Sequence, residues 1–223
     1  MALLNRVEYC TKDLFDAQGH VWNHIFNFIN SMSLKCALQL CIPMKLSQLV
    51  NALPINKAKS NIVFCLMRVL IHSKFFTKIK ISDDDNQNEG YWHTPASLFL
   101  LRDDPISIAP LALAMLDPAM IDPWHHVSEW FQNESSSSFV TKHGMSFREY
   151  GKIEEKMNRL FNEAMAGDER FFTSVAINEC KQVFEVLKSM VDVGGGTGIV
   201  AKAIADALIS WLEMYRSRSS TCC

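Results

Sequence analysis

Apolar side chains recur at three- and four-residue steps over the first third of the chain, the pattern of amphipathic helices. Residues 13–42 are predicted to form helices with one broad apolar stripe: Phe15, Val21, Trp22, Ile25, Phe26, Ile29 and Met32. Pro43 ends this stretch. A short helix is expected at 48–53, capped by Ser47, and a stronger one at 57–72.

A two-stranded hairpin is predicted next, because residues 75–81 are rich in strand formers and 91–94 can return after a polar turn. Helices followed by a two-stranded wing predict a winged helix. A nucleic-acid-binding winged helix needs a basic outward face, whereas Lys57, Lys59 and Arg68 do not form one stripe on a helix that is otherwise nearly all apolar. We therefore expect burial against a partner subunit and no nucleic-acid binding.

The second half of the chain again has a helical pattern of apolar residues, and this pattern ends at a short apolar run. Prolines divide residues 105–123 into short helices, and 146–187 carries recurring apolar faces. Residues 190–193 then predict a buried strand, followed by a glycine turn and a helix from Ile199. The fold class expected from this order is mainly α, with the start of an α/β unit at the end.

Composition narrows the class of protein. Hydrophobic residues make up 48% and charged residues 21%, with a net charge of −2, so no bulk attraction to nucleic acid or anionic membrane is expected. Seven cysteines without metal-ligand spacing indicate reduced, buried thiols. No apolar stretch is long enough to span a bilayer, and the start lacks a secretory pattern, so a cytoplasmic location is expected. Cys222-Cys223 resembles a lipidated tail, but nothing else in the chain supports lipidation.

Four of the nine glycines lie close together, at Gly194, Gly195, Gly196 and Gly198. Glycine lets a ligand approach the backbone closely, and the helix that follows offers free N–H donors. The dinucleotide fingerprint would need glycine at position 199, where Ile199 stands. A nucleoside carrying an amino-acid tail fits this loop better than a pyrophosphate does, and a merely structural turn remains the alternative.

Several stretches then point to one family. Val191-Asp-Val-Gly-Gly-Gly-Thr-Gly198 resembles the S-adenosylmethionine loop of plant small-molecule O-methyltransferases of the caffeic acid and isoflavone or flavonoid type. Residues 24–35, 116–118, 124–126 and 161–168 agree with the same family, and the resemblance covers roughly residues 10–207.

The resemblance implies a winged-helix-like N-terminal dimerisation domain, placed at 1–115, and a Rossmann-like methyltransferase domain from 116 to 223 that is incomplete. It implies S-adenosyl-L-methionine as cofactor, a phenolic hydroxyl of a flavonoid or phenylpropanoid as acceptor, and a homodimer or a heterodimer with a full-length relative. In this family the partner's N-terminal region lines the substrate pocket.

Site residues carry over by position. Gly194 and Gly196 match the cofactor loop, and Asp192 is expected to support it. Phe161 and Met165 match positions that touch the aromatic acceptor. Phe147 and Met115 are further candidates for the acceptor wall, and Arg148 replaces the bulky aromatic residue usual after Phe147. Ordinary core packing is the alternative for all four apolar residues.

The proton acceptor is the part that the sequence does not supply. A phenol must lose its proton to become a good nucleophile, and the family's basic histidine lies well beyond the glycine loop. All seven histidines precede the loop; adjacent His125 and His126 diverge on a helix, and no metal site is expected.

The end of the chain departs from the family as well. Glu213 stands at the spacing of a ribose-binding acid, although the helical pattern continues through it. The sequence leaves the family pattern from about residue 208, which suggests a C-terminal truncation. We therefore expect a methyltransferase chain that is inactive by itself or, alternatively, a non-catalytic dimerisation partner.

Overall fold

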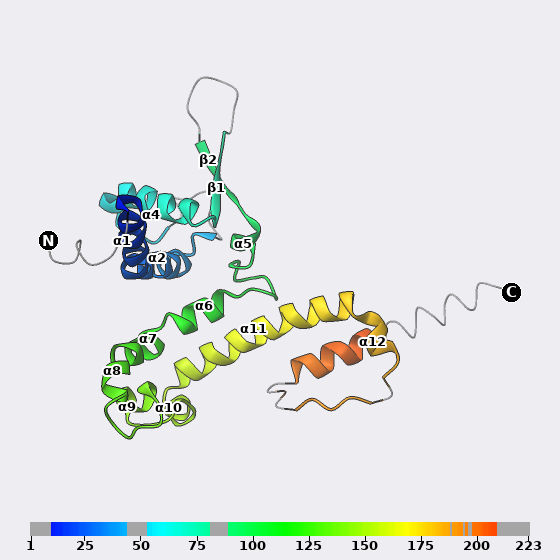
Figure 1. The fold of residues 1–223 in the computed structure, drawn as a ribbon. Helices are drawn as coiled ribbons and strands as arrows, with labels where there is room; N and C mark the ends of the chain where they lie inside the picture. The colour runs from blue at the N-terminus through cyan, green and yellow to red at the C-terminus, as the bar shows by residue number, and fades with distance from the viewer. Residues whose placement is uncertain are drawn as a thin grey trace. The chain divides into compact units, whose positions relative to one another are not determined.

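A computed structural model describes residues 10–43, 53–80, 89–187, 189–193, 195 and 198–208. The chain divides into two compact units, Met1–Thr94 and Pro95–Cys223, and both are mainly helical, as expected (Figure 1). The functional boundary between residues 115 and 116 stays a prediction, because the compact units mark a division in contacts and not in function.

The first unit begins with helices α1 (Thr11–Phe26) and α2 (Phe28–Gln39). A 3-10 turn, η2 (Lys57–Lys59), leads into α4 (Ser60–His72), and the Asn56 side chain caps this turn by accepting from the Ala58 amide at 3.0 Å. The helices expected at 13–42 and 57–72 are thereby confirmed. The short helix expected at 48–53 lies outside the described residues except for its last position.

The predicted wing is also present. Strands β1 (Phe76–Lys80) and β2 (Glu89–His93) pair antiparallel, with Phe76 opposite His93. The Thr94 hydroxyl donates to the Phe75 carbonyl at 2.8 Å and ties the returning strand to the start of β1. Partial burial lowers the pKa of His93, whose ring lies 5.7 Å from that of Phe76.

The core of the first unit lies between α2, α4 and β1. Helix α4 contributes Val63, Met67 and Leu70 at helical spacing, each at most 3% exposed. The whole buried cluster is Ala37, Ile42, Leu53, Val63, Met67, Leu70 and Phe76. Helix α1 contributes no buried residue, and its apolar stripe is left exposed in this chain.

The second unit is a succession of helices. They are α5 (Pro95–Leu98), α6 (Ala109–Met115), α7 (Pro118–His125), α8 (Val127–Trp130), α9 (Ser138–His143), α10 (Phe147–Ile153), α11 (Glu155–Glu179) and α12 (Lys181–Glu185). Residues 199–208 are helical as well. Side chains of Asp117, Ser137 and Ser146 cap α7, α9 and α10, so the chain can turn sharply between short helices.

Helix α6 packs along the long helix α11, and small residues allow the two to approach closely. Ala109 and Ala114 on α6 and Ala164 on α11 are fully buried. A Cβ at Gly167 would come within 2.5 Å of the Ser107 carbonyl oxygen, so only glycine fits this position without a shift of the backbone. This contact fixes α6 against the middle of α11.

Two expectations from the sequence are wrong for the described residues. Residues 190–193 form no strand, and Val191 and Val193 are 83% and 90% exposed, because the sheet described in this structure is the β1–β2 wing alone. A strand is buried only where neighbouring strands and helices cover it. The described cysteines are free but not buried: Cys10, Cys65 and Cys180 are exposed, and Cys36 and Cys41 are half-buried.

Within the described residues, no helix combines the length and apolarity that crossing a bilayer requires.

Candidate acceptor wall and glycine loop

Two of the predicted acceptor residues lie in ring contact. Phe147 opens α10 and Phe161 lies in the second turn of α11, and their ring centroids are 4.8 Å apart at an angle of 66°. Edge-to-face pairs of this kind stabilise by about 0.5–1.5 kcal/mol beyond area burial. Both side chains are half-buried, so the pair presents an aromatic surface that is partly open.

Behind Phe147 the aromatic contacts continue into α9 and α10. The Phe139 ring meets Phe147 at 5.5 Å and Tyr150 at 5.5 Å, both nearly perpendicular. His143 stacks on Phe139 at 4.3 Å, and its Nε2 lies 3.1 Å from the Ala119 carbonyl oxygen in α7. A hydrogen bond there makes Nε2 the protonated nitrogen and holds the ring in one orientation. These residues support Phe147 from behind.

The electrostatics of α10 follow from its capping. The Ser146 hydroxyl donates to Glu149 at 2.7 Å, and the Ser146 amide donates to the same carboxylate at 2.9 Å. These two bonds hold the pKa of Glu149 below its usual value. Burial, with smaller contributions from Glu154 and Asp117, raises the pKa of Tyr150, which therefore stays protonated near neutral pH. The capping box fixes the start of α10, where Phe147 lies.

The two methionines of the predicted wall lie on the helices that pack together. Met165 follows Phe161 by one turn of α11, so both side chains lie on one face of that helix. Met115 is the last residue of α6 and is 36% exposed. Arg148, which follows Phe147, is exposed. The roles of these residues toward an acceptor stay predictions.

The described part of the glycine loop is tightly folded. The Asp192 carboxylate lies so close to Gly195 that a Cβ there would collide with it, and the Gly198 amide donates to the Gly195 carbonyl at 2.6 Å. Gly198 has φ +74°, a conformation that favours glycine, and its carbonyl accepts from Lys202 in the helix that follows. Gly194 and Gly196, the predicted cofactor residues, lie outside the described residues.

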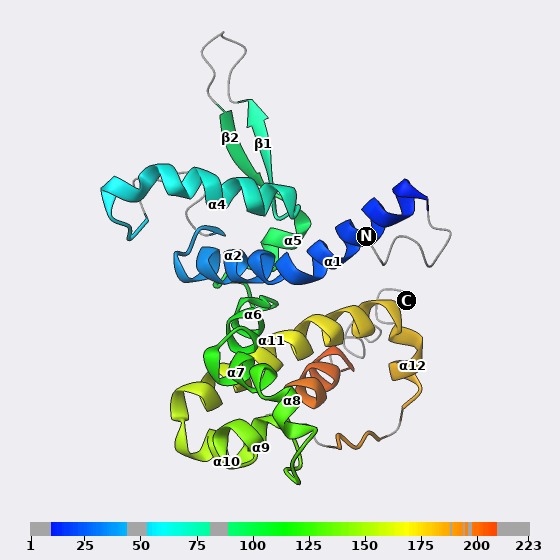
Figure 2. The ribbon, with the colours of Figure 1, turned by 60° about the vertical axis from the view of Figure 1, so that its left-hand side comes forward.

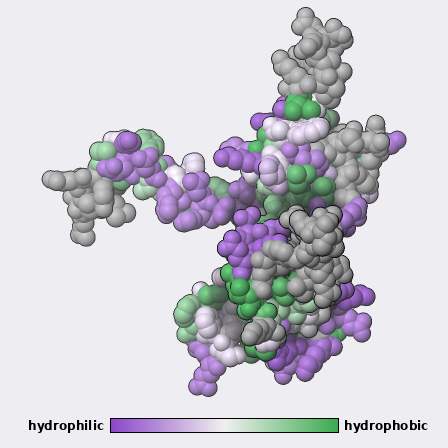
Figure 3. Space-filling model, turned by 90° about the vertical axis from the view of Figure 1, so that its right-hand side faces the viewer, coloured by the Kyte–Doolittle hydropathy of each residue, from purple (hydrophilic) through white to green (hydrophobic). Residues whose placement is uncertain are grey.

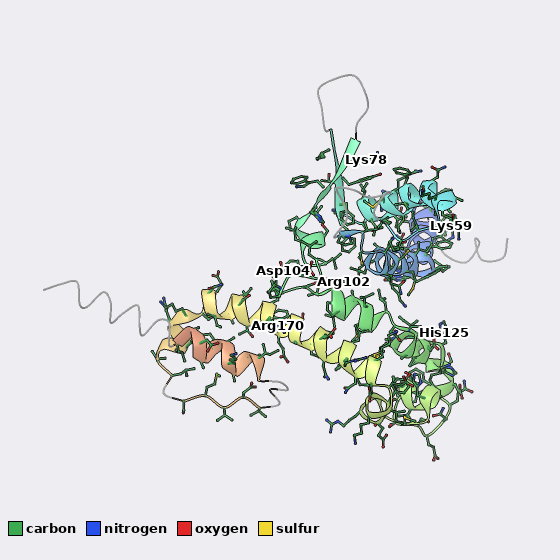
Figure 4. The ribbon with its side chains drawn as sticks, turned by 180° about the vertical axis from the view of Figure 1, so that it is seen from behind. Lys59, Lys78, Arg102, Asp104, His125 and Arg170 are labelled. Atoms are coloured by element: carbon green, nitrogen blue, oxygen red, sulfur yellow. The ribbon has the colours of Figure 1, made fainter. Side chains whose placement is uncertain are left out.

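A groove of about 410 Å³ is lined mainly by residues 102–110 and by α11, and Ile199 of this helix also contributes to it. Arg102, Asp104 and Arg170 line it together with Ile199, and Arg170 donates to the Pro105 carbonyl at 3.2 Å. Figure 4 shows Arg170 on α11 facing the segment that carries Arg102 and Asp104. The groove contains charges of both signs and therefore favours polar groups over an aromatic ring.

The histidines of the described residues fall into separate places. His126 Nδ1 lies 2.9 Å from Glu129, while adjacent His125 makes no such contact, so the two do not act as a pair. No group of three or more metal-ligating side chains occurs among the described residues. Of the described histidines, His143 is the one whose ring joins the aromatic cluster of α9 and α10.

Sequence reasoning missed the residues that support the wall, namely Phe139, His143 and Tyr150. Their signal was the spacing of four, four and three residues from Phe139 through His143 and Phe147 to Tyr150, interrupted by Gly144 with φ +72°. Since a helix ends at Gly144, periodicity alone did not place the two halves of this pattern together.

Comparison with known proteins assigns both halves of the chain. An O-methyltransferase dimerisation domain matches residues 22–103, and an O-methyltransferase domain matches residues 124–210. The mitomycin 7-O-methyltransferase MmcR and the pyocyanin biosynthetic protein PhzM have similar folds, with TM-scores of 0.63 and 0.65 at 24% and 23% identity. The alignments cover 89% and 86% of this chain and 57% and 56% of the two structures.

Plant enzymes are more similar to the chain in sequence than these two structures are. The chain is 51% identical to 8-hydroxyquercetin 8-O-methyltransferase of Mentha piperita over 93% of its own length and 60% of the relative's. It is 52% identical to trans-resveratrol di-O-methyltransferase of Vitis vinifera over 87% of its length and 57% of the relative's. The chain therefore spans less than two thirds of the length of these relatives. The two matching domains, which together span most of the chain, show that the chain belongs to the O-methyltransferase family.

Proposed function

We propose that this chain is part of an S-adenosylmethionine-dependent O-methyltransferase that methylates a phenolic hydroxyl of a flavonoid or phenylpropanoid. The observation that carries the proposal is the ring pair of Phe147 and Phe161, which lies in a chain 50% identical to the flavonoid 8-O-methyltransferase 1 of Ocimum basilicum. We further propose a homodimer, or a heterodimer with a full-length relative, in the cytoplasm.

The glycine loop supports the proposal that the cofactor is S-adenosylmethionine. S-adenosylmethionine supplies a methyl group bound to a positively charged sulfur, and its nucleoside needs close backbone approach. A Cβ at Gly195 would collide with the Asp192 carboxylate, so this position of the loop accepts only glycine without a shift of Asp192. Gly194, Gly196 and Asp192 are the residues that we propose to hold the cofactor.

The acceptor side has the chemistry of an aromatic ring site. Phe147 and Phe161 offer edges and faces to a planar ligand, and Met165, one turn beyond Phe161, can adapt its shape to the ring. Met115 ends α6, which Gly167 holds against α11. We propose that these residues position the phenol, because methyl transfer needs the nucleophile and the methyl group in line.

We expect the 223-residue polypeptide to be inactive, or nearly so, by itself. Of the described histidines, His143 is the one beside the aromatic cluster of α9 and α10. Its Nε2 is hydrogen-bonded to the Ala119 carbonyl. The alternative proposal is a non-catalytic partner that pairs with a full-length relative and alters its activity. The N-terminal unit has a hydrophobic core of its own, which contains Met67 and Leu70.

Two assays test these proposals. Methyl transfer from labelled S-adenosylmethionine to a panel of flavonoids is measured for the polypeptide alone and mixed with a full-length relative. We expect no product from the polypeptide alone and a changed rate in the mixture. Turnover by the polypeptide alone would contradict the expectation of inactivity, and an unchanged rate in the mixture would contradict the partner role.

A further inference from the structure

A proline inside α7 leaves one backbone carbonyl without its usual partner. In an α-helix the carbonyl of residue 119 accepts from the amide of residue 123, but Pro123 has no N–H. Ala119 is the second residue of α7, so this carbonyl lies in the first turn. The His143 ring supplies a donor instead, with Nε2 3.1 Å from the Ala119 oxygen. A side chain of α9 therefore takes the place of a missing backbone donor in α7.

The Ala119 end of this bond is fixed relative to Met115, the last residue of α6. Between the two helices the Asp117 amide donates to the Ala114 carbonyl at 3.1 Å, and the Asp117 carboxylate accepts from the Ala119 amide at 3.0 Å. Ala114 is fully buried, and α6 packs on α11. The turn from α6 to α7 is held at both of its ends, so the separation of Ala119 from Met115 is fixed.

The His143 end of the bond is fixed relative to Phe147. The His143 ring lies 4.3 Å from the Phe139 ring, and the Phe139 ring meets the Phe147 ring at 5.5 Å. Gly144 ends α9 in the left-handed conformation, and its amide donates to the Val140 carbonyl at 2.8 Å. Figure 2 shows α7, α8, α9 and α10 grouped at one end of the second unit. One side chain of α9 thus connects the start of α7 with the start of α10.

A weaker contact joins the same two helices, α7 and α9. Lys142 Nζ lies 3.6 Å from the Asp122 carboxylate, and both side chains are partly exposed. Exposed ion pairs of this kind contribute little. Water competes less for the partly buried bond between His143 and Ala119, which is therefore the stronger of the two connections.

Apolar side chains at the surface do not by themselves distinguish the acceptor wall. Figure 3 shows hydrophobic residues among hydrophilic ones on the side of the second unit that carries α12. Val183 in α12 and Val186 at its end are 60% and 77% exposed. What distinguishes Met115 and Phe147 is that His143 connects the segments that carry them.

We propose that His143 is a positioning residue for the acceptor, because its bond to Ala119 sets the spacing of Met115 and Phe147. This inference rests on the acceptor wall proposed above and names the residue that fixes two parts of that wall relative to each other. His143 acts through these two residues and does not itself contact the acceptor. A wall whose spacing is already set binds a planar ring without first having to be ordered.

Binding of the flavonol quercetin to the full 223-residue chain tests this role, with the dissociation constant measured by calorimetric titration. His143→Phe keeps a ring beside Phe139 but cannot donate to Ala119. We expect this variant to raise the dissociation constant about three- to tenfold, because binding must then restore the spacing that one hydrogen bond otherwise maintains.

Two further variants show whether the hydrogen bond is responsible. His143→Gln keeps an N–H group that can donate to the Ala119 carbonyl, and its dissociation constant should stay within about twofold of the wild-type value. His125→Phe, the same substitution as His143→Phe at an exposed histidine of α7, is the matched control and should leave the constant unchanged. If His143→Gln weakened binding as much as His143→Phe does, the role assigned to the bond would be overturned.

A comparison of backgrounds separates positioning from a general loss of stability. If His143 sets the spacing of Met115 and Phe147, that spacing no longer matters once either side chain is removed. In the Met115→Ala and Phe147→Ala chains, His143→Phe should therefore change the dissociation constant less than about twofold. A general loss of folded protein would weaken binding by the same factor in all three backgrounds, and that result would overturn the positioning role.

The outcomes also distinguish this inference from the proposed function. If the wild-type chain binds quercetin and His143→Phe binds it as tightly as His125→Phe does, the acceptor wall stands and the positioning role is overturned. If the wild-type chain shows no saturable binding, the wall is overturned and the positioning role with it. Circular dichroism reports whether each variant folds. If His143→Phe does not fold, His143→Leu, which also lacks a donor, takes its place with the same expectations.

Discussion

Replacing Gly167 by alanine tests the contact that holds α6 against α11. The new Cβ would lie 2.5 Å from the Ser107 carbonyl oxygen, well inside van der Waals contact. Ser107 is only 4% exposed, and its hydroxyl donates to the Phe99 carbonyl at 3.2 Å, so it has little freedom to move away. Overpacking of this kind costs about 1–3 kcal/mol. The better helix propensity of alanine returns up to about 1 kcal/mol, which leaves a net loss of about 0–2 kcal/mol relative to the wild type and about 1–3 kcal/mol relative to an alanine variant without the clash.

The assay is urea unfolding followed by circular dichroism, with two matched glycine-to-alanine controls. A Cβ at Gly19 in α1 meets nothing within 4 Å, and one at Gly151 in α10 meets Asn158 at an ordinary 3.6 Å. Both control variants gain helix propensity without a clash and are expected to be neutral or slightly more stable. If Gly167→Ala proved as stable as these controls, the steric reasoning would be refuted.

Three further predictions concern the surroundings of the wall and the wing. Ser146→Ala removes the cap of α10 and is expected to lower the free energy of unfolding by about 0.5–2 kcal/mol in chemical unfolding. Because the pKa of Glu149 is lowered in the folded state, the contribution of Glu149 to stability is present at neutral pH and is lost as the pH falls through the folded pKa. The lowered pKa of His93 means that the unfolded chain binds a proton first, so stability should fall as the pH drops through about 6.5, and His93→Phe should flatten that slope in thermal melts. His143→Ala removes the bond to the Ala119 carbonyl and the stack on Phe139, and should cost about 1–3 kcal/mol; an unaltered melting temperature would contradict its supporting role.

Much of the helical architecture could be predicted from the sequence because it depends on local pattern. The spacing of Val63, Met67 and Leu70 predicts α4 and its buried face, and the strand formers around Phe76 predict the wing. Capping residues such as Ser146 mark where helices begin. These signals depend on only a few neighbouring residues, so they can be recognised without knowledge of tertiary contacts.

What sequence pattern could not predict depends on partners distant in the chain. Residues 190–193 have the composition of a buried strand, but Val191 is exposed. Whether such a segment forms a strand depends on neighbouring strands that pair with it, and its own residues do not decide this. The contact of His143 with Ala119 joins α9 to α7 across 24 residues, and the fit of Gly167 to Ser107 depends on two segments meeting. The roles of Gly194 and Gly196 rest on family resemblance, since both lie outside the described residues.

The central claim is that Phe147, Phe161, Met165 and Met115 form a wall for an aromatic acceptor. Equilibrium binding of a flavonol tests this claim most directly. Titration followed by calorimetry or tryptophan fluorescence should show saturable binding to the wild-type chain. Phe161→Ala should weaken that binding at least about tenfold, because aromatic pairs and their burial contribute on the order of 1–3 kcal/mol. Phe131→Ala, at a ring that is 77% exposed outside the cluster, should leave binding unchanged. Equal affinity of both variants, or no saturable binding by the wild type, would contradict the account.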